Sequence, residues 1–244
     1  MTTSTLKTSD ETPAKSAYWA GCRDGLPFIL MAAPFATVFG VIATDAGLTL
    51  AQAMGFSVFV IAGSAQFAAI HMMLENASIA LVLLAALAVN LRMVMYSAAL
   101  VPYLGPASLW QRAFVAYLNF DQTYIVSVAR YEKRPEMTVP DRVAYFFGVA
   151  TPIVPFWVSM TLVGALVGSA VPDAWALDFI MPIMFLAMVA PMLKSIAHVA
   201  AAVMSIVVAL SLVELPSGIG LLIAAGAAML TGACVEIWME RRAQ

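Results

Sequence analysis

Eight long apolar stretches constrain this chain more than any other feature of its sequence. They run over residues 25–44, 52–74, 78–101, 112–130, 142–168, 177–193, 196–213 and 217–237. A helix needs ~20 mostly apolar residues to cross the ~30 Å hydrocarbon core of a bilayer. Because 63% of the 244 residues are hydrophobic and only 11% are charged, one soluble core cannot bury them all. The sequence therefore predicts an all-α, polytopic membrane helix bundle with about eight transmembrane helices, some of them broken or kinked.

The basic residues between these stretches predict the orientation of the bundle. If the N-terminus is cytoplasmic, ten basic residues face the cytoplasm: Lys7, Lys15, Arg23, Arg130, Lys133, Arg134, Arg142, Lys194, Arg241 and Arg242. Only Arg112 falls in an outside loop. Basic residues concentrate on the cytoplasmic side of membrane proteins. We therefore expect both termini in the cytoplasm, which requires an even number of crossings.

The domain organisation predicted from the sequence is simple. Residues 1–17 are polar and rich in Thr and Ser, so we expect a disordered cytoplasmic tail. Residues 18–240 form a single transmembrane domain with short loops. Net charge is −2 without a basic tract, so no nucleic-acid partner is expected. The sequence has no P-loop, dinucleotide fingerprint or metal-ligand spacing, and we expect neither an enzyme nor a cofactor.

A glycine and two polar residues lie in the middle of the second stretch. Gly63, Ser64 and Gln66 form part of the segment Ala-Gly-Ser-Ala-Gln. Gly and Ser weaken a helix, so one interpretation is an unwound patch whose free backbone groups bind a zwitterion. The other is close packing against a neighbouring helix, which small residues permit. The sequence leaves both open.

Ionisable residues occur at matching depths in the third and fourth stretches. Asn90 and Arg92 lie near the middle of the third, and Asn119 and Asp121 near the middle of the fourth. A buried charge in a bilayer needs a partner, so we expect an Arg92–Asp121 ion pair. This pair is either purely structural or part of a substrate site. In the second case Arg92 faces a substrate carboxylate and Asp121 faces an ammonium group.

Two residues are candidates for coupling transport to protons. Asp121 is one of them, and His71, near the cytoplasmic end of the second stretch, is the other. Histidine changes its charge near neutral pH, which suits proton coupling. An interfacial histidine is more often a satisfied polar residue, so this interpretation competes with a structural one.

Small residues recur at helix-packing spacing near the end of the fifth stretch and within the eighth. Gly164 and Gly168 are four residues apart, as are Ala224, Ala228 and Gly232. Such spacing allows close contact with another helix. The partner helix belongs either to this chain or to another.

Several of these segments together resemble the AzlC family, the large subunit of two-component branched-chain amino acid exporters. The specific blocks are Ala62-Gly63-Ser64-Ala65-Gln66-Phe67 and Asn90-Leu91-Arg92, supported by Gly21, Gly25, Pro27, Phe39-Gly40, Gly47, Asp121 and Leu177-Asp178-Phe179. The resemblance covers roughly residues 20–235. One departure is that Gln122 stands where we expect the family to have a glutamate after the aspartate.

The resemblance implies export of leucine, isoleucine and valine, with methionine as a further candidate, across the bacterial inner (plasma) membrane. It also implies a small AzlD-type membrane subunit as partner. Candidate substrate-binding residues are Gly63, Ser64, Gln66, Asn90, Arg92, Asn119 and Asp121. The alternative is a channel or structural subunit of a membrane complex for another small solute. Saturable, stereoselective transport distinguishes a carrier from that alternative.

Overall fold

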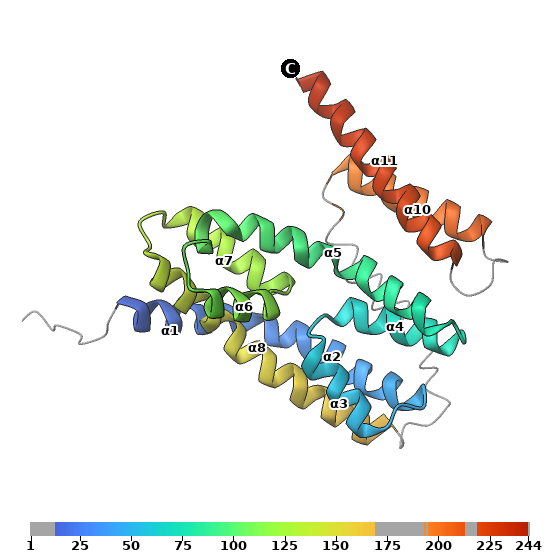
Figure 1. Ribbon diagram of the computed structural model, residues 1–244, viewed down its shortest axis with the longest axis horizontal. Coiled ribbons are helices and arrows are strands. Elements are labelled where there is room, and N and C mark those ends of the chain that lie inside the picture. Colours follow the sequence, from blue (N-terminus) through green and yellow to red (C-terminus); the bar gives the residue numbers. More distant parts are fainter. Residues whose placement is uncertain (1–12, 169–192, 194, 213–218, 244) are drawn as a thin grey trace, which may run out of the picture.

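The computed structural model describes residues 13–168, 193, 195–212 and 219–243, and every regular element among them is a helix (Figure 1). The ten described helices are α1 (Pro13–Gly25), α2 (Pro27–Asp45), α3 (Leu50–Phe59), α4 (Gly63–Leu74), α5 (Ile79–Leu104), α6 (Leu109–Tyr117), α7 (Asp121–Lys133), α8 (Val139–Gly168), α10 (Ile196–Ser211) and α11 (Ile219–Ala243). The all-α prediction is confirmed.

Four of the described helices are long and apolar enough to cross a membrane. They are α2, α5, α8 and, within α11, residues Ile223–Arg242. The stretch predicted at 196–213 forms α10, which has 16 residues. The stretch predicted at 177–193 lies almost entirely outside the described residues. The structure thus supports a polytopic bundle, with four of the eight expected spans present as long continuous helices.

The second and fourth predicted spans are interrupted, in agreement with the expectation that some helices of the bundle are broken. The second is divided into α3 and α4, with non-helical residues at 60–62. The fourth is divided into α6 and α7, with a break at 118–120. Apolar composition indicates that a segment lies outside water. It does not indicate whether the backbone stays helical, because other protein groups can pair with backbone amides and carbonyls outside a helix.

The first described helix begins within the segment predicted to be a disordered tail. Helix α1 begins at Pro13, so residues 13–17, which we assigned to a disordered tail, are helical. Proline is well suited to the first turn of a helix because its missing N–H is not needed there. The hydroxyl of Tyr18 donates to Oγ1 of Thr151 on α8 at 3.0 Å, which ties α1 to the bundle. Residues 1–12 lie outside the described part.

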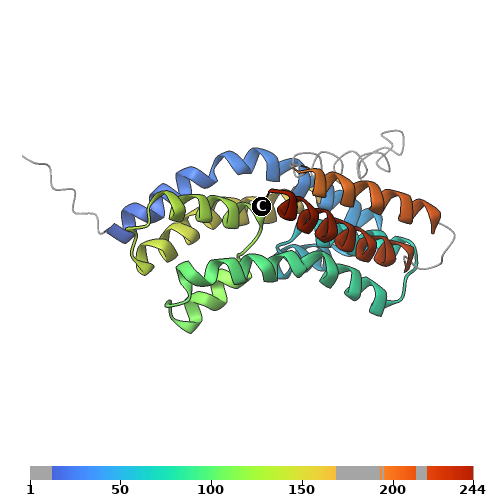
Figure 2. The same cartoon turned by 90° about the horizontal axis from the view of Figure 1, so that it is seen from above.

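Helices α1 and α2 follow α8 along its length, and glycines make this contact close (Figures 1 and 2). A Cβ atom on Gly21 would lie 3.1 Å from Cα of Gly148, and a Cβ on Gly40 would lie 3.0 Å from the carbonyl carbon of Gly164. From the first contact to the second, the residue numbers increase on both sides, so α1–α2 and α8 run parallel. The small-residue spacing at Gly164 therefore contacts a helix of this chain.

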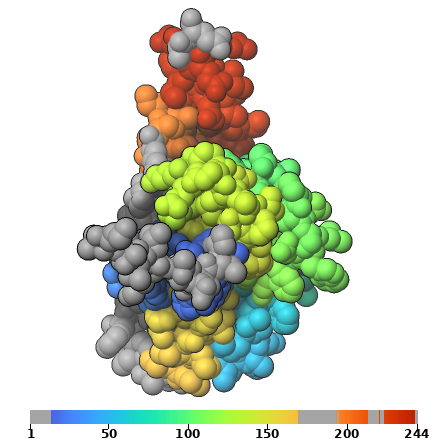
Figure 3. Space-filling model, turned by 90° about the vertical axis from the view of Figure 1, so that its left-hand side faces the viewer, coloured from blue at the N-terminus to red at the C-terminus, as the bar shows by residue number. Residues whose placement is uncertain are grey.

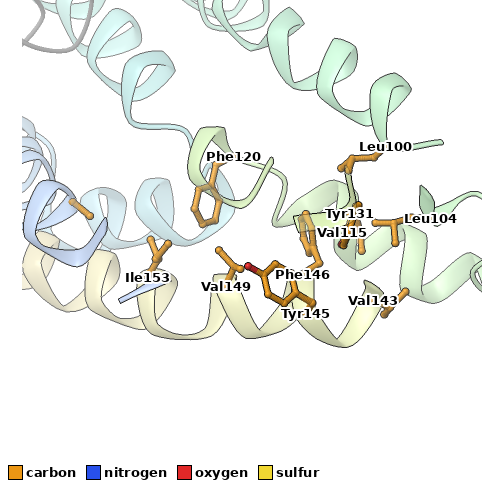
Figure 4. Close-up of a cluster of buried hydrophobic side chains, with 11 residues drawn as sticks. Leu100, Leu104, Val115, Phe120, Tyr131, Val143, Tyr145, Phe146, Val149 and Ile153 are labelled. Carbon is orange, nitrogen blue, oxygen red and sulfur yellow. The ribbon is translucent and has the colours of Figure 1, made fainter. Parts of the chain in front are cut away.

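The largest apolar cluster lies between α8 and the helices that precede it. Tyr145, Phe146, Val149 and Ile153 of α8 are buried, and Phe120 from the break between α6 and α7 points toward them (Figure 4). This packing holds the break between α6 and α7 in place on the side that faces α8. Helices α10 and α11 form a separate hairpin, seen in orange and red above the rest of the chain in Figure 3.

Candidate functional site

The first helix break separates α3 from α4 at residues 60–62. Helix α3 ends where the amide of Val60 donates to the carbonyl oxygen of Phe56 at 3.0 Å. Helix α4 then starts at Gly63 after Ala62, whose side chain offers no cap to the first amides of α4. Gln66, which is 0% exposed, donates from Nε2 to the same Phe56 carbonyl at 3.1 Å. The unwound patch expected near Gly63 is present, and it lies over residues 60–62.

The second break is stabilised by a buried threonine. The amide of Phe120 donates to Oγ1 of Thr123 at 3.0 Å, and the Thr123 hydroxyl is 2.8 Å from the carbonyl oxygen of Leu118. Thr123 is 0% exposed, so its hydroxyl takes the place of missing helical partners. Asn119 donates from Nδ2 to Oγ of Ser97 on α5 at 3.1 Å. Helix α7 begins immediately afterwards at Asp121.

Arg92, at the middle of α5, joins the two breaks. Its Nη2 donates to Oγ of Ser64, in the first turn of α4. The same nitrogen lies 3.2 Å from Oδ2 of Asp121, the first residue of α7. The ion pair predicted between Arg92 and Asp121 is therefore confirmed, and it brings together the N-terminal ends of two separate helices.

The other ends of the interrupted helices also meet. The hydroxyl of Tyr117, the last residue of α6, donates to the carbonyl oxygen of Val58 near the end of α3. Like ends of the half-helices therefore lie together: C-terminal ends of α3 and α6, and N-terminal ends of α4 and α7. A helix carries a partial positive charge at its N-terminus and a partial negative charge at its C-terminus. The two breaks consequently form a centre with a positive and a negative side.

Asp121 has a second partner on α5. The hydroxyl of Tyr96 donates to Oδ1 of Asp121 at 3.0 Å, so each carboxylate oxygen has one partner. The ring of Tyr96 stacks on Tyr124 of α7, with ring centroids 4.2 Å apart. The side chains of Arg92 and Asp121 are 19% and 27% exposed, so the pair is largely shielded by the chain itself.

Five polar atoms around this centre are buried without a hydrogen-bond partner among the described residues. They are Oε1 of Gln66, Oδ1 of Asn90, Nε of Arg92, Oδ1 of Asn119 and Nε1 of Trp157. Native proteins rarely leave such groups unpaired, so each calls for an explanation. The set contains both hydrogen-bond acceptors and donors, which is what a zwitterionic ligand requires.

The structure groups most of the predicted site residues and separates one. Gly63, Ser64, Gln66, Arg92, Asn119 and Asp121 all lie at the two breaks or between them, and Asn90 is two residues before Arg92 on α5. His71 lies toward the opposite end of α4, where its side chain is 55% exposed and 3.8 Å from Glu75. The structure does not bring His71 to this centre, and its role in proton coupling stays a prediction.

Sequence analysis missed three aromatic residues at the centre: Tyr96, Tyr117 and Trp157. Each looks like an ordinary apolar position in a membrane helix, so no sequence signal distinguishes it. A Cβ atom added to Gly63 would lie 2.8 Å from Cη2 of Trp157 on α8. Both interpretations of Gly63 therefore apply, because it begins α4 after the break and also packs closely against a neighbouring helix.

Replacing Gly63 by alanine is expected to destabilise the protein by about 1 kcal/mol, because the new methyl group must displace the Trp157 ring. Adding Trp157→Phe removes the crowded ring atom, so the two effects should not be additive. The measurement is the temperature at which the detergent-solubilised protein loses its monodisperse peak. Gly226→Ala, where the added atom meets open space, is the matched control. Purely additive losses would contradict the contact.

Among the described residues, no group of three or more His, Cys, Asp or Glu side chains is arranged to hold a metal ion. The described residues at the centre offer hydrogen-bond donors and acceptors, an ion pair and four helix ends.

Comparison with known proteins identifies relatives of this chain. A family model described as "AzlC protein" matches residues 27–171, a range that includes both helix breaks. "Inner membrane protein YgaZ" of Escherichia coli (strain K12) is 25% identical, and the match covers 73% of this chain and 74% of that protein. Two proteins called "Uncharacterized membrane protein" from Helicobacter pylori are each 26% identical, covering 61% of this chain and 63% of theirs. No solved structure matches.

Proposed function

Because the chain belongs to the AzlC family of inner-membrane proteins, we propose that it exports branched-chain amino acids as the large subunit of a two-component secondary transporter. The substrates in this proposal are leucine, isoleucine and valine, with methionine as a further candidate. The partner is a small AzlD-type membrane subunit. Transport would use the membrane gradient, and the chain would act as a carrier rather than an enzyme.

The observation that carries this proposal is the meeting of two interrupted helices around Arg92. Arg92 lies at the middle of α5, a helix long enough to span the bilayer, so the centre sits near the membrane midplane. Interrupted helices whose free ends bind a charged solute at this depth are a recurring feature of secondary transporters. An amino acid needs partners of both signs, and this centre has both.

The parallel packing of α2 and α8 agrees with the path of the helices between them. Between them lie the α3–α4 pair, α5 and the α6–α7 pair. Each interrupted pair turns back at its break: Ala53 of α3 and Ile70 of α4 pack in one cluster beside Ala43. Likewise, Tyr131 near the end of α7 lies beside Tyr103 near the end of α5, so α6 and α7 start and end on the same side (Figure 1). Only the crossing of α5 then separates α2 from α8, and the two helices must point the same way. The glycine contacts of Gly40 with Gly164 have this direction. Both termini in the cytoplasm remain part of the proposal.

An unpartnered apolar surface is available for the lipid bilayer and for a membrane partner. In the most apolar windows of α5 and α11, only 6% of the residues are buried within the chain. Leu83, Leu87, Leu91 and Val94 of α5 are each more than half exposed. Such surface is stable only in lipid or against another membrane segment. This surface supports an AzlD-type partner without identifying its position.

The proposal is tested by amino acid efflux from cells preloaded with leucine- and valine-containing dipeptides. We expect this chain to accelerate the efflux of both amino acids when it is produced together with the small membrane protein encoded beside it. The efflux should saturate and should prefer L- over D-amino acids, because a carrier site contacts its substrate stereospecifically. Non-saturable efflux of both enantiomers would favour the channel alternative. Unchanged efflux, with the protein shown to be in the membrane, would contradict the proposal.

A further inference from the structure

The two sides of the centre differ in net charge, and this difference assigns the orientation of a bound amino acid. On the side of the α4 and α7 N-termini, the charges of Arg92 and Asp121 cancel. The two helix N-termini then contribute about half a positive charge each. On the side of the α3 and α6 C-termini, the helix ends contribute about half a negative charge each. The charges of the helix ends thus favour one negative and one positive group at the centre while the ion pair stays closed.

The Gln66 amide, in the first turn of α4, presents an unpaired oxygen. The Phe56 carbonyl near the end of α3 can only accept, so the nitrogen of the amide must face it, at 3.1 Å. Oε1 of Gln66 therefore points away from that carbonyl. It has no donor within the described chain, and the residue is 0% exposed.

A second buried oxygen belongs to Asn119, within the other break. Nδ2 of Asn119 is engaged with Ser97, whereas Oδ1 has no donor among the described residues, and Asn119 is 3% exposed. Asn119 follows Tyr117 by two residues, and Phe56 precedes Val58 by two. The Tyr117–Val58 hydrogen bond therefore joins the end of α6, next to Asn119, to the end of α3, which Gln66 contacts. Buried acceptor oxygens without donors are suited to a group that can only donate, such as an ammonium group.

Asp121 is less suited to hold that donor. Its Oδ1 accepts from Tyr96 at 3.0 Å and its Oδ2 lies 3.2 Å from Arg92, so an ammonium group would have to displace an existing partner. Nε of Arg92, in contrast, is buried and unpaired among the described residues, so it can donate to a carboxylate while Nη2 keeps its bonds.

We propose that Gln66, on α4 beside the C-terminal end of α3, and Asn119, just after the C-terminal end of α6, bind the ammonium group of the amino acid. The closed Arg92–Asp121 pair and the N-termini of α4 and α7 receive its carboxylate. This assignment rests on the proposed function. It replaces Asp121, the ammonium partner expected from the sequence, and it makes Asp121 a positioning residue for Arg92.

The test compares leucine with two analogues that each lack one charged group. Binding of radiolabelled leucine is measured with the full chain in membranes that also contain the small partner subunit. The competitors are unlabelled leucine, 4-methylpentanoate, which lacks the ammonium group, and 3-methylbutylamine, which lacks the carboxylate. A hydrogen bond to a charged group contributes enough that losing it lowers affinity about tenfold or more. Gln66→Leu and Asn119→Leu should each weaken leucine and 3-methylbutylamine by that factor and leave 4-methylpentanoate unchanged.

Asn119→Asp and Asp121→Asn make the test decisive. Asn119→Asp keeps an acceptor oxygen and should restore ammonium recognition. Asp121→Asn should leave the preference for leucine over 4-methylpentanoate intact. The assignment is overturned if Asp121→Asn alone removes that preference, or if the Gln66 and Asn119 variants weaken all three competitors equally. If membranes with the wild-type protein bind neither leucine nor valine, the proposed function itself is overturned. If they bind leucine and the variants give the contrary results above, only the assignment of the ammonium site is overturned.

Discussion

The variant Arg92→Gln is expected to lose export of branched-chain amino acids and to unfold more easily by about 3–5 kcal/mol. Removing one partner of a buried ion pair leaves the other charge without compensation, and that penalty has this size. Asp121 would keep only Tyr96 as a partner. Ser64, in the first turn of α4, would lose the guanidinium that now joins it to α7.

The double variant Arg92→Gln/Asp121→Asn separates a structural pair from a functional one. Neutralising both residues removes the unpaired charge, so thermal stability should recover most of the loss. Export should not recover, because the substrate carboxylate has then lost its cationic partner. Efflux and thermal stability are measured on the same preparations, with Arg112→Gln as a control in which an exposed arginine is removed. Recovery of export together with stability would show that the pair is only structural.

The variant Gly164→Ala is expected to destabilise the protein by about 1–3 kcal/mol, because overpacking a close helix contact costs this much. The new Cβ atom would meet the backbone of Thr37 on α2, with Cα of Thr37 3.0 Å away. A backbone atom cannot move aside as a flexible side chain can. The parallel contact of α2 with α8 would therefore have to open, although alanine is the better helix former.

Gly55→Ala is the matched control for this prediction. Gly55 also lies inside a helix, but a Cβ atom added there meets nothing within 4 Å. This control should unfold at the same temperature as the wild type or higher, because alanine favours the helix by about 1 kcal/mol. The measurement is the thermal unfolding midpoint of each variant in detergent. Equal midpoints for Gly164→Ala and Gly55→Ala would contradict the close contact between α2 and α8.

Several features of the site were predictable from residue chemistry. A buried arginine in a membrane helix requires a partner, and Asp121 was the acidic residue at matching depth, so the pair with Arg92 followed from the sequence. The weak helix around Gly63 was also predictable, because glycine and serine interrupt helices. The position of the break, at residues 60–62, was not, because the break contacts other helices there: Tyr117 of α6 binds the Val58 carbonyl, and Trp157 of α8 packs against Gly63.

By itself, the sequence determined that the chain is a helical membrane protein and which side chains cannot lie in lipid. These properties depend on the hydrophobicity and charge of each residue, which can be read one position at a time. Only the tertiary structure decided that two predicted spans are interrupted and that their like ends meet around Arg92. A backbone carbonyl or amide leaves a helix only where another segment satisfies it. Tyr117 meets that condition at the first break, where its hydroxyl, from a helix far along the chain, donates to the carbonyl oxygen of Val58.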